Sequence, residues 1–166
     1  EKIDDTAKNI LIDDNKLTEE TINIIENAKY TGESAGNFFN LTAKIAEIKY
    51  DQPNISELQG VFVVITLSNL RKIYIKSDKA VFNKETTDAE FFGNIFLTEQ
   101  DNIITCDNLD LFMSKNLITA YNSVKYKNSK NSYVLADKID IDMMTAEANI
   151  YMFDKKNDKV KVKYRN

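Results

Sequence analysis

The amino-acid sequence predicts an all-β chain, elongated and twisted, in which about four similar units form two facing walls. Apolar and polar residues alternate with a period of two over short stretches rich in β-branched and aromatic residues, which is typical of half-buried strands. The longest apolar run, residues 61–65, has the length and β-branching of a buried strand. Similar segments also recur at a common spacing, which is typical of a fold built from stacked units.

Composition limits the chemistry that the chain can perform. Hydrophobic residues make up 43% of the 166 residues and charged residues 29%, so one packed domain is expected rather than disorder. The 22 basic and 26 acidic side chains give a formal net charge of −4, which argues against a nucleic-acid partner. The chain has no His and a single Cys, Cys106, which excludes His-based catalysis, His-liganded zinc and an intrachain disulfide. We therefore expect no enzyme, no cofactor and no metal site.

The two ends of the chain carry opposite charge. Residues 1–21 are acidic and show no sustained period, so we interpret them as an N-terminal linker. Because the sequence begins at Glu1 and not at Met, we expect a signal or anchor segment to have preceded it. Near the other end, Val160, Val162 and Tyr164 alternate with basic residues, which is typical of a charged edge strand. A phosphate-contacting edge is the alternative interpretation.

Three segments match when they are placed in register: residues 77–82, 106–111 and 136–141. Each reads small, Asp, Lys or Asn, apolar, any, apolar, and their Asp residues lie 29 and 30 positions apart. Further along, three short motifs match as small or turn-tolerant, polar, then β-branched, namely residues 93–95, 122–124 and 148–150. A looser earlier unit begins near residue 42, so about four units account for most of the chain.

The apolar alternation changes phase at the same place in each unit. Ile73 and Ile75 share one face, and after Asp78 the apolar face continues with Ala80 and Phe82. A phase change at a fixed position is typical of a bend or bulge at a sheet corner, where an Asp can accept backbone N–H bonds. The pattern leaves two arrangements open. The walls either meet around an ordinary core or splay around an apolar groove.

The ordered set of motifs resembles the LptA/LptC/OstA-like β-jelly-roll family of periplasmic lipopolysaccharide-export proteins, which includes the N-terminal domain of the translocon LptD. Residues 72–80, followed after a polar loop by residues 91–95, are similar to the repeating pattern of that family. Residues 28–46 resemble its opening hairpin, and the whole similarity runs from about residue 22 to residue 164. Within the family, the acidic lead-in and the limited length favour the LptC type over the LptA type.

The resemblance implies a twisted, open β-jelly-roll over residues 22–166 that follows the acidic linker, residues 1–21. It implies a periplasmic protein anchored to the inner membrane by an N-terminal helix that this sequence lacks. The implied function is lipopolysaccharide transport, in which an apolar groove shelters the lipid A acyl chains. Lipid would pass from an LptB/LptF/LptG-type ABC transporter, bound at the N-terminal edge, to an LptA-like bridge protein, bound at the C-terminal edge. Such edges pair by β-augmentation, and the same edges would also allow a homodimer.

We predict that this groove is open along one side. Burying one acyl CH₂ contributes about 0.8 kcal/mol, so a fully closed pocket would release several chains too slowly for transport. The partner edge implied by the resemblance comprises Val160, Val162 and Tyr164. The predicted lipid-binding residues are Ile75, Ala80, Phe82, Ile95, Ile104, Leu109, Leu111, Val124, Ile139, Ile141 and Ile150.

The same sequence also admits other interpretations. The competing class is a structural or adhesive β-repeat domain with a closed core and no lipid ligand. A lipocalin-like carrier is disfavoured because the chain has no Trp for the opening strand of such a barrel. The acidic series between residues 107 and 142 lacks the Gly-rich turns of repeat calcium sites, so corner-bonding or solvent-facing roles are expected. Cys106 occupies the small position of its unit and is expected to be a buried, inert thiol.

Overall fold

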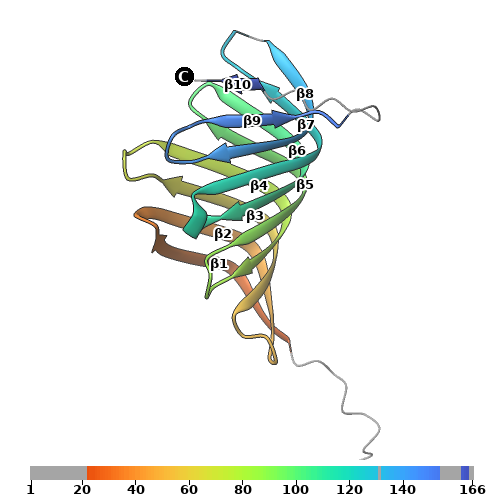
Figure 1. Cartoon of the computed structure of the whole chain (residues 1–166). Helices are drawn as coiled ribbons and strands as arrows, with labels where there is room; N and C mark the ends of the chain where they lie inside the picture. Colours follow the sequence, from red (N-terminus) through yellow and green to blue (C-terminus); the bar gives the residue numbers. More distant parts are fainter. Residues whose placement is uncertain (1–21, 131, 154–161, 165–166) are drawn as a thin grey trace, which may run out of the picture.

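The structure, a computed structural model, describes residues 22–130, 132–153 and 162–164. Nine strands form one open antiparallel sheet in which each strand pairs with its neighbours in sequence, and a short tenth strand pairs with the ninth (Figure 1). No α-helix occurs in these residues, and one 3₁₀ turn, η1 (Met113–Lys115), joins two strands. The predicted all-β open sheet is confirmed.

The strands are long for a globular protein, and most have between 10 and 13 residues. Their bounds are β1 (Ile22–Ser34), β2 (Asn37–Lys49), β3 (Ile55–Thr66), β4 (Lys72–Asn83), β5 (Ala89–Glu99), β6 (Asn102–Phe112), β7 (Leu117–Lys127), β8 (Tyr133–Asp142), β9 (Ala148–Tyr151) and β10 (Val162–Tyr164).

Bends divide the strands into two halves, and the bends line up across the sheet. Pairing shifts register near the middle of each strand pair from β4–β5 to β7–β8. Strands β1, β3, β5 and β7 have left-handed backbone at this place, with φ between 47 and 74°. These left-handed residues are Asn27 in β1, Gly60 in β3, Gly93 and Asn94 in β5, and Asn122 and Ser123 in β7. Consecutive left-handed residues reverse the local pleat, which turns the strand away from its first direction.

Two of the three small–polar–branched motifs, residues 93–95 and 122–124, therefore mark bends. Aligning residues 148–150 with them was wrong, because Ala148 and Ile150 pair regularly with β8. The tight turns explain the mismatch. In the turn of residues 83–88 the N–H of the first residue bonds the carbonyl of the last, and the turn of residues 142–147 closes with the same bond. Residue 148 therefore corresponds to residue 89, and not to residue 93.

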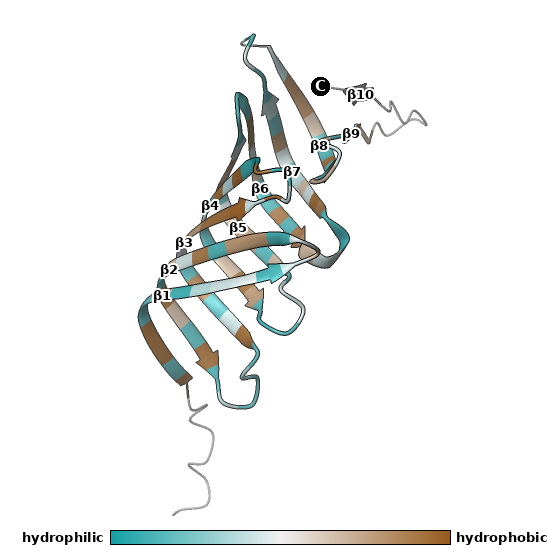
Figure 2. Cartoon of the chain, turned by 90° about the vertical axis from the view of Figure 1, so that its left-hand side faces the viewer, coloured by the Kyte–Doolittle hydropathy of each residue, from teal (hydrophilic) through white to brown (hydrophobic). Residues whose placement is uncertain are grey.

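The predicted phase change is confirmed by burial. In β4, Ile75 and Ala80 are buried on the same face, with the exposed pair Asp78 and Lys79 between them. The burial patterns of β6 and β8 change phase at the equivalent places. Figure 2 shows the alternation of apolar and polar residues along the strands that produces these patterns.

Asp and Asn side chains brace the bends. Asp78 Oδ2 accepts a 2.6 Å bond from the side-chain amide of Asn94, and Asp137 accepts one from the backbone N–H of Phe153. In the middle unit the acceptor is Asn108, one residue beyond the predicted Asp107. A Cβ at position 93 would lie 3.1 Å from Asp78 Oδ2, so the left-handed backbone and the close carboxylate together favour glycine there.

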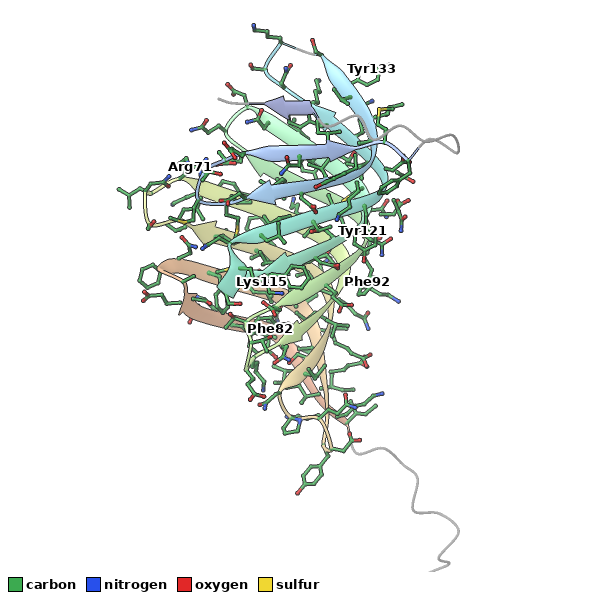
Figure 3. The ribbon with its side chains drawn as sticks, in the orientation of Figure 1. Arg71, Phe82, Phe92, Lys115, Tyr121 and Tyr133 are labelled. Atoms are coloured by element: carbon green, nitrogen blue, oxygen red, sulfur yellow. The ribbon has the colours of Figure 1, made fainter. Side chains whose placement is uncertain are left out.

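The bends bring two walls face to face. The first wall comprises residues 28–43, 61–77, 95–106 and 124–136, and the second comprises residues 22–26, 44–59, 79–92, 108–121 and 138–151. Rings meet across the interior, because the Phe82 ring centroid lies 5.3 Å from that of Tyr30 and 5.7 Å from that of Phe39. The Tyr30 hydroxyl also lies 3.0 Å from Ser56 Oγ on the second wall. Phe82, labelled in Figure 3, is buried.

Candidate functional site

The eleven apolar residues predicted to bind lipid all lie on the inner faces of the two walls. They belong to one buried cluster, and none is more than 8% exposed. The first wall contributes Ile75, Ile95, Ile104 and Val124, and the second contributes Ala80, Phe82, Leu109, Leu111, Ile139, Ile141 and Ile150. Lipid contact by these residues stays a prediction.

The predicted open groove is not present among the described residues, because the walls meet around a packed core. The physical reason is that two apolar walls with nothing between them are stabilised by burying each other. Each Å² of apolar surface removed from water contributes about 25 cal/mol. The interior is therefore a continuous apolar layer, closed in this structure.

A pocket of about 50 Å³ lies within this layer toward the β9 end. It has room for roughly three or four water-sized groups, and not for an acyl chain. Both walls line it, and polar side chains stand on one side of the lining. The lining residues are Leu97, Glu99, Asn102, Ile104 and Tyr126 from the first wall, and Ile139, Ile141, Ala146, Ala148 and Ile150 from the second. Four of the eleven predicted residues, Ile104, Ile139, Ile141 and Ile150, thus line this space.

Side-chain contacts join the margins of the walls on the side opposite the bends. Asn37 Nδ2 donates to Asn116 Oδ1 at 2.6 Å, and Ser68 Oγ lies 4.0 Å from Met144 Sδ. We call this line of contacts, together with the bond from Arg71 to Met143, the seam. Sequence reasoning missed all of these residues, because they belong to loops and strand ends with no period of their own.

Arg71, labelled in Figure 3, makes two contacts at the seam. Its Nη2 donates to the Met143 carbonyl at 2.6 Å, and its Nη1 lies 2.6 Å from Glu99 Oε1. The two side chains are 21% and 14% exposed, so the ion pair is largely shielded from water. Burial raises the pKa of Glu99, and the charge of Arg71 opposes that rise. One cation therefore fixes a first-wall carboxylate and a second-wall turn at once.

The single cysteine has the environment predicted for it. Cys106 is 4% exposed, and burial, together with the charge of Asp107, raises the pKa of its thiol to about 12. A thiol that stays protonated is a poor nucleophile and a poor metal ligand. Among the described residues, no three Asp, Glu or Cys side chains lie close enough together to hold a metal ion.

The predicted partner edge is described only in part. Val162 pairs with Ile150 and Tyr164 with Ala148, so these two residues lie in the strand that ends the sheet. Val160 and the acidic linker, residues 1–21, lie outside the described residues. In the described part of the chain, no helix is long and apolar enough to cross a membrane.

A row of acidic residues crosses the outer face of the second wall. Register pairs link Glu47, Glu57, Glu90, Asp110 and Asp140 through the intervening strands. Burial raises the pKa of Asp110, the Tyr121 hydroxyl that donates to it at 3.2 Å opposes the rise, and the charge of Glu90 adds to it. The ionised form of Asp110 is therefore less stable in the folded protein than in water.

The substitution Asp110→Asn is expected to stabilise the fold at pH 7. The folded-state pKa of Asp110 is raised, so stability is greatest below the unfolded pKa, about 3.9, and is lost as pH rises through the folded value. Asn removes this loss and still accepts the bond from Tyr121. Urea unfolding should show a higher midpoint for the variant at pH 7 and a smaller gain near pH 4. A gain of equal size at both pH values would contradict the electrostatic explanation, and Asp107→Asn, at an exposed site, is the control.

A scan against models of known protein families gives no match for this chain, and a search of curated protein sequences gives none either.

Proposed function

We propose that this chain is a lipopolysaccharide-transport domain of the LptC type, a β-jelly-roll of about four repeats that shelters lipid A acyl chains between its walls. It takes lipid from an inner-membrane ABC transporter and passes it to a periplasmic bridge. The observation that supports the proposal most is the continuous apolar layer between the walls, which contains all eleven predicted residues. Lipid transfer needs no nucleophile or metal, which suits the residues available.

In this proposal the walls separate at the seam when lipid enters. The bends are covalently continuous, whereas the seam is held by non-covalent contacts, each of which involves a side chain. Separating the walls exposes apolar surface, and an incoming chain of twelve carbons offsets this loss by roughly 8–10 kcal/mol. Because the two terms oppose each other, net binding is weaker than in a preformed closed pocket. Release then stays fast enough for transport.

The sheet edges serve as the partner sites in this proposal. β1 is the first strand of the sheet formed by the described residues, and its outer edge, 13 residues long, has no partner strand among them. Such an edge offers unpaired backbone groups to an added strand. The transporter pairs with this N-terminal edge, and an LptA-like protein pairs beside β10 at the other end. A homodimer through the same edges is the competing assembly. The domain acts in the periplasm, next to an inner-membrane anchor.

The test is photo-crosslinking from inside the walls. A compact diazirine amino acid replaces Ile104, which borders the pocket and so has space for it. The matched control carries the same residue at Val81, which lies between Ala80 and Phe82 but on the outer face of the second wall. Irradiation with lipopolysaccharide should give a lipid adduct at position 104 and none at position 81. No adduct at position 104, nor at positions 139 and 150, would reject the proposal.

A second candidate function is favoured by one observation. The walls meet with only a small pocket between them, as they would in a structural or adhesive β-repeat domain with a closed core. Such a domain would give no adduct at any inward position. It would also show no change in its unfolding transition when lipopolysaccharide is added, whereas a lipid carrier is stabilised by its ligand.

A further inference from the structure

The outer face of the first wall carries an unusual set of side chains. Two register rows run side by side across eight strands, from β1 to β8. One row consists of Lys29, Thr42, Phe62, Lys76, Phe96, Thr105, Lys125 and Leu135, and the other of Thr31, Asn40, Val64, Tyr74, Thr98, Ile103, Lys127 and Tyr133. We call these two rows the cationic face.

The cationic face has four lysines and no acidic residue, although the chain as a whole has a net charge of −4. Two neighbouring rows on the outer face of the second wall, one from Ile24 through Glu47 to Asp140 and the other from Glu26 through Gln59 to Lys138, carry six carboxylates and only two lysines. The outer surfaces of the two walls therefore have opposite charge. The order of residues along the chain does not show this separation of charge, because each strand contributes residues to both walls.

The cationic face is also apolar where a solvent-facing sheet is usually polar. Phe62, Tyr74 and Phe96 are 36%, 38% and 42% exposed, and with Lys76 and Thr98 they line a shallow hollow of about 250 Å³. At the other end of the rows, Leu135 and Tyr133 are 59% and 61% exposed (Tyr133 is labelled in Figure 3). Contiguous exposed apolar side chains mark contact surfaces.

Lysines and rings are arranged together on this face. The Lys125 ammonium lies 4.6 Å from the centroid of the Tyr133 ring, and Lys76 lies 6.0 Å from that of Phe62. The rings of Phe62 and Tyr74 stack with centroids 6.3 Å apart. Two of the four lysines, Lys76 and Lys125, thus lie close to an aromatic ring. Interfacial membrane contacts use this arrangement, with rings at headgroup level and cations at the phosphates.

We propose that the cationic face docks on an anionic phospholipid headgroup surface. Its charge complements such a surface, and the carboxylates of the second wall then point away from it. The mixture of Leu, Ile and Val with the rings suits the acyl boundary, whereas single-stranded nucleic acid is bound by stacking on rings. Two rows over eight strands span roughly 500 Å² on a twisted sheet. A stable rigid dimer buries more, ~800 Å² on each partner, so the area of the cationic face argues against a second copy as its partner.

The experiment is flotation of the purified chain with vesicles of phosphatidylcholine, with and without a minor fraction of phosphatidylglycerol. At low salt the chain should float with the anionic vesicles and not with the neutral ones. The variant K76Q/K125Q should lower the apparent affinity by roughly tenfold or more, since each lysine near an anionic surface adds to binding. The control variant K79Q/K84Q makes the same charge change at exposed positions outside the cationic face, and should float like the unmodified chain.

Other outcomes overturn the proposal. Failure to float with anionic vesicles, or an equal loss in both variants, would mean that the face does not dock there. Self-association that K76Q/K125Q abolishes, without flotation, would assign the face to a second copy. Displacement from vesicles by a single-stranded oligonucleotide at low concentration would assign it to nucleic acid. None of these results depends on the adduct at position 104, so this proposal and the lipid-transport proposal fail separately.

Discussion

A covalent link across the seam, between positions 68 and 144, is expected to abolish the lipid adduct at position 104. Ser68 Oγ and Met144 Sδ lie 4.0 Å apart, and both side chains are exposed, so the changes Ser68→Cys and Met144→Cys leave the core untouched. If the interior opens by separating the walls at the seam, the link holds them together. Adduct yield with lipopolysaccharide should then fall to the background seen at position 81.

The link is made with a thiol-cleavable bifunctional maleimide reagent, in a chain where Cys106→Ala removes the native thiol. A first control carries the same two cysteines, each capped singly, and should give the adduct of the unlinked chain. A second control places the linked pair at Thr66→Cys and Lys72→Cys, which face each other within the first wall. That link should leave the adduct intact. An undiminished adduct in the chain linked across the seam would mean that lipid enters by another route, such as the open ends of the sheet.

Much of the fold was predictable because it depends on patterns within single strands. A period of two and a phase change after Asp78 placed the apolar faces of β4 correctly on both sides of the bend. All eleven predicted inward residues are buried for the same reason: burial on one face of a strand follows directly from alternation. The motifs at residues 93–95 and 122–124 marked bends because small or turn-tolerant residues adopt left-handed backbone most readily.

Features that depend on contacts between distant strands were not predictable. Residues 148–150 resemble the bend motifs, but the turn before them, residues 142–147, sets their register. This turn has the same closing hydrogen bond as the turn of residues 83–88, so residue 148 is equivalent to residue 89. Whether the walls meet or splay depends on the balance between wall-to-wall burial and lipid binding, which no short motif encodes. The seam and the cationic face arise only when the bends bring halves of different strands together.

Removing Arg71 is expected to have the largest effect of any single change at the seam. In Arg71→Met, Glu99 keeps a shielded carboxylate without its cation, which should cost about 2–3 kcal/mol of unfolding free energy. This figure lies below the usual range for a fully buried pair because both side chains retain some solvent contact. The pKa of Glu99, already raised by burial, should rise further. The variant's stability should therefore fall as pH increases through that higher pKa.

A double-mutant cycle separates the ion pair from the packing of the long side chains. Glu99→Leu combined with Arg71→Met removes both charges, so the double variant should recover much of the stability that Arg71→Met loses, as measured by urea unfolding. Losses that simply add would show that the pair is not coupled. Arg71→Met also breaks the bond to the Met143 carbonyl and so loosens the seam. Its adduct yield at position 104 should rise while its stability falls, since a loosened seam lets the walls part more often. A purely structural role for Arg71 predicts a lower yield instead.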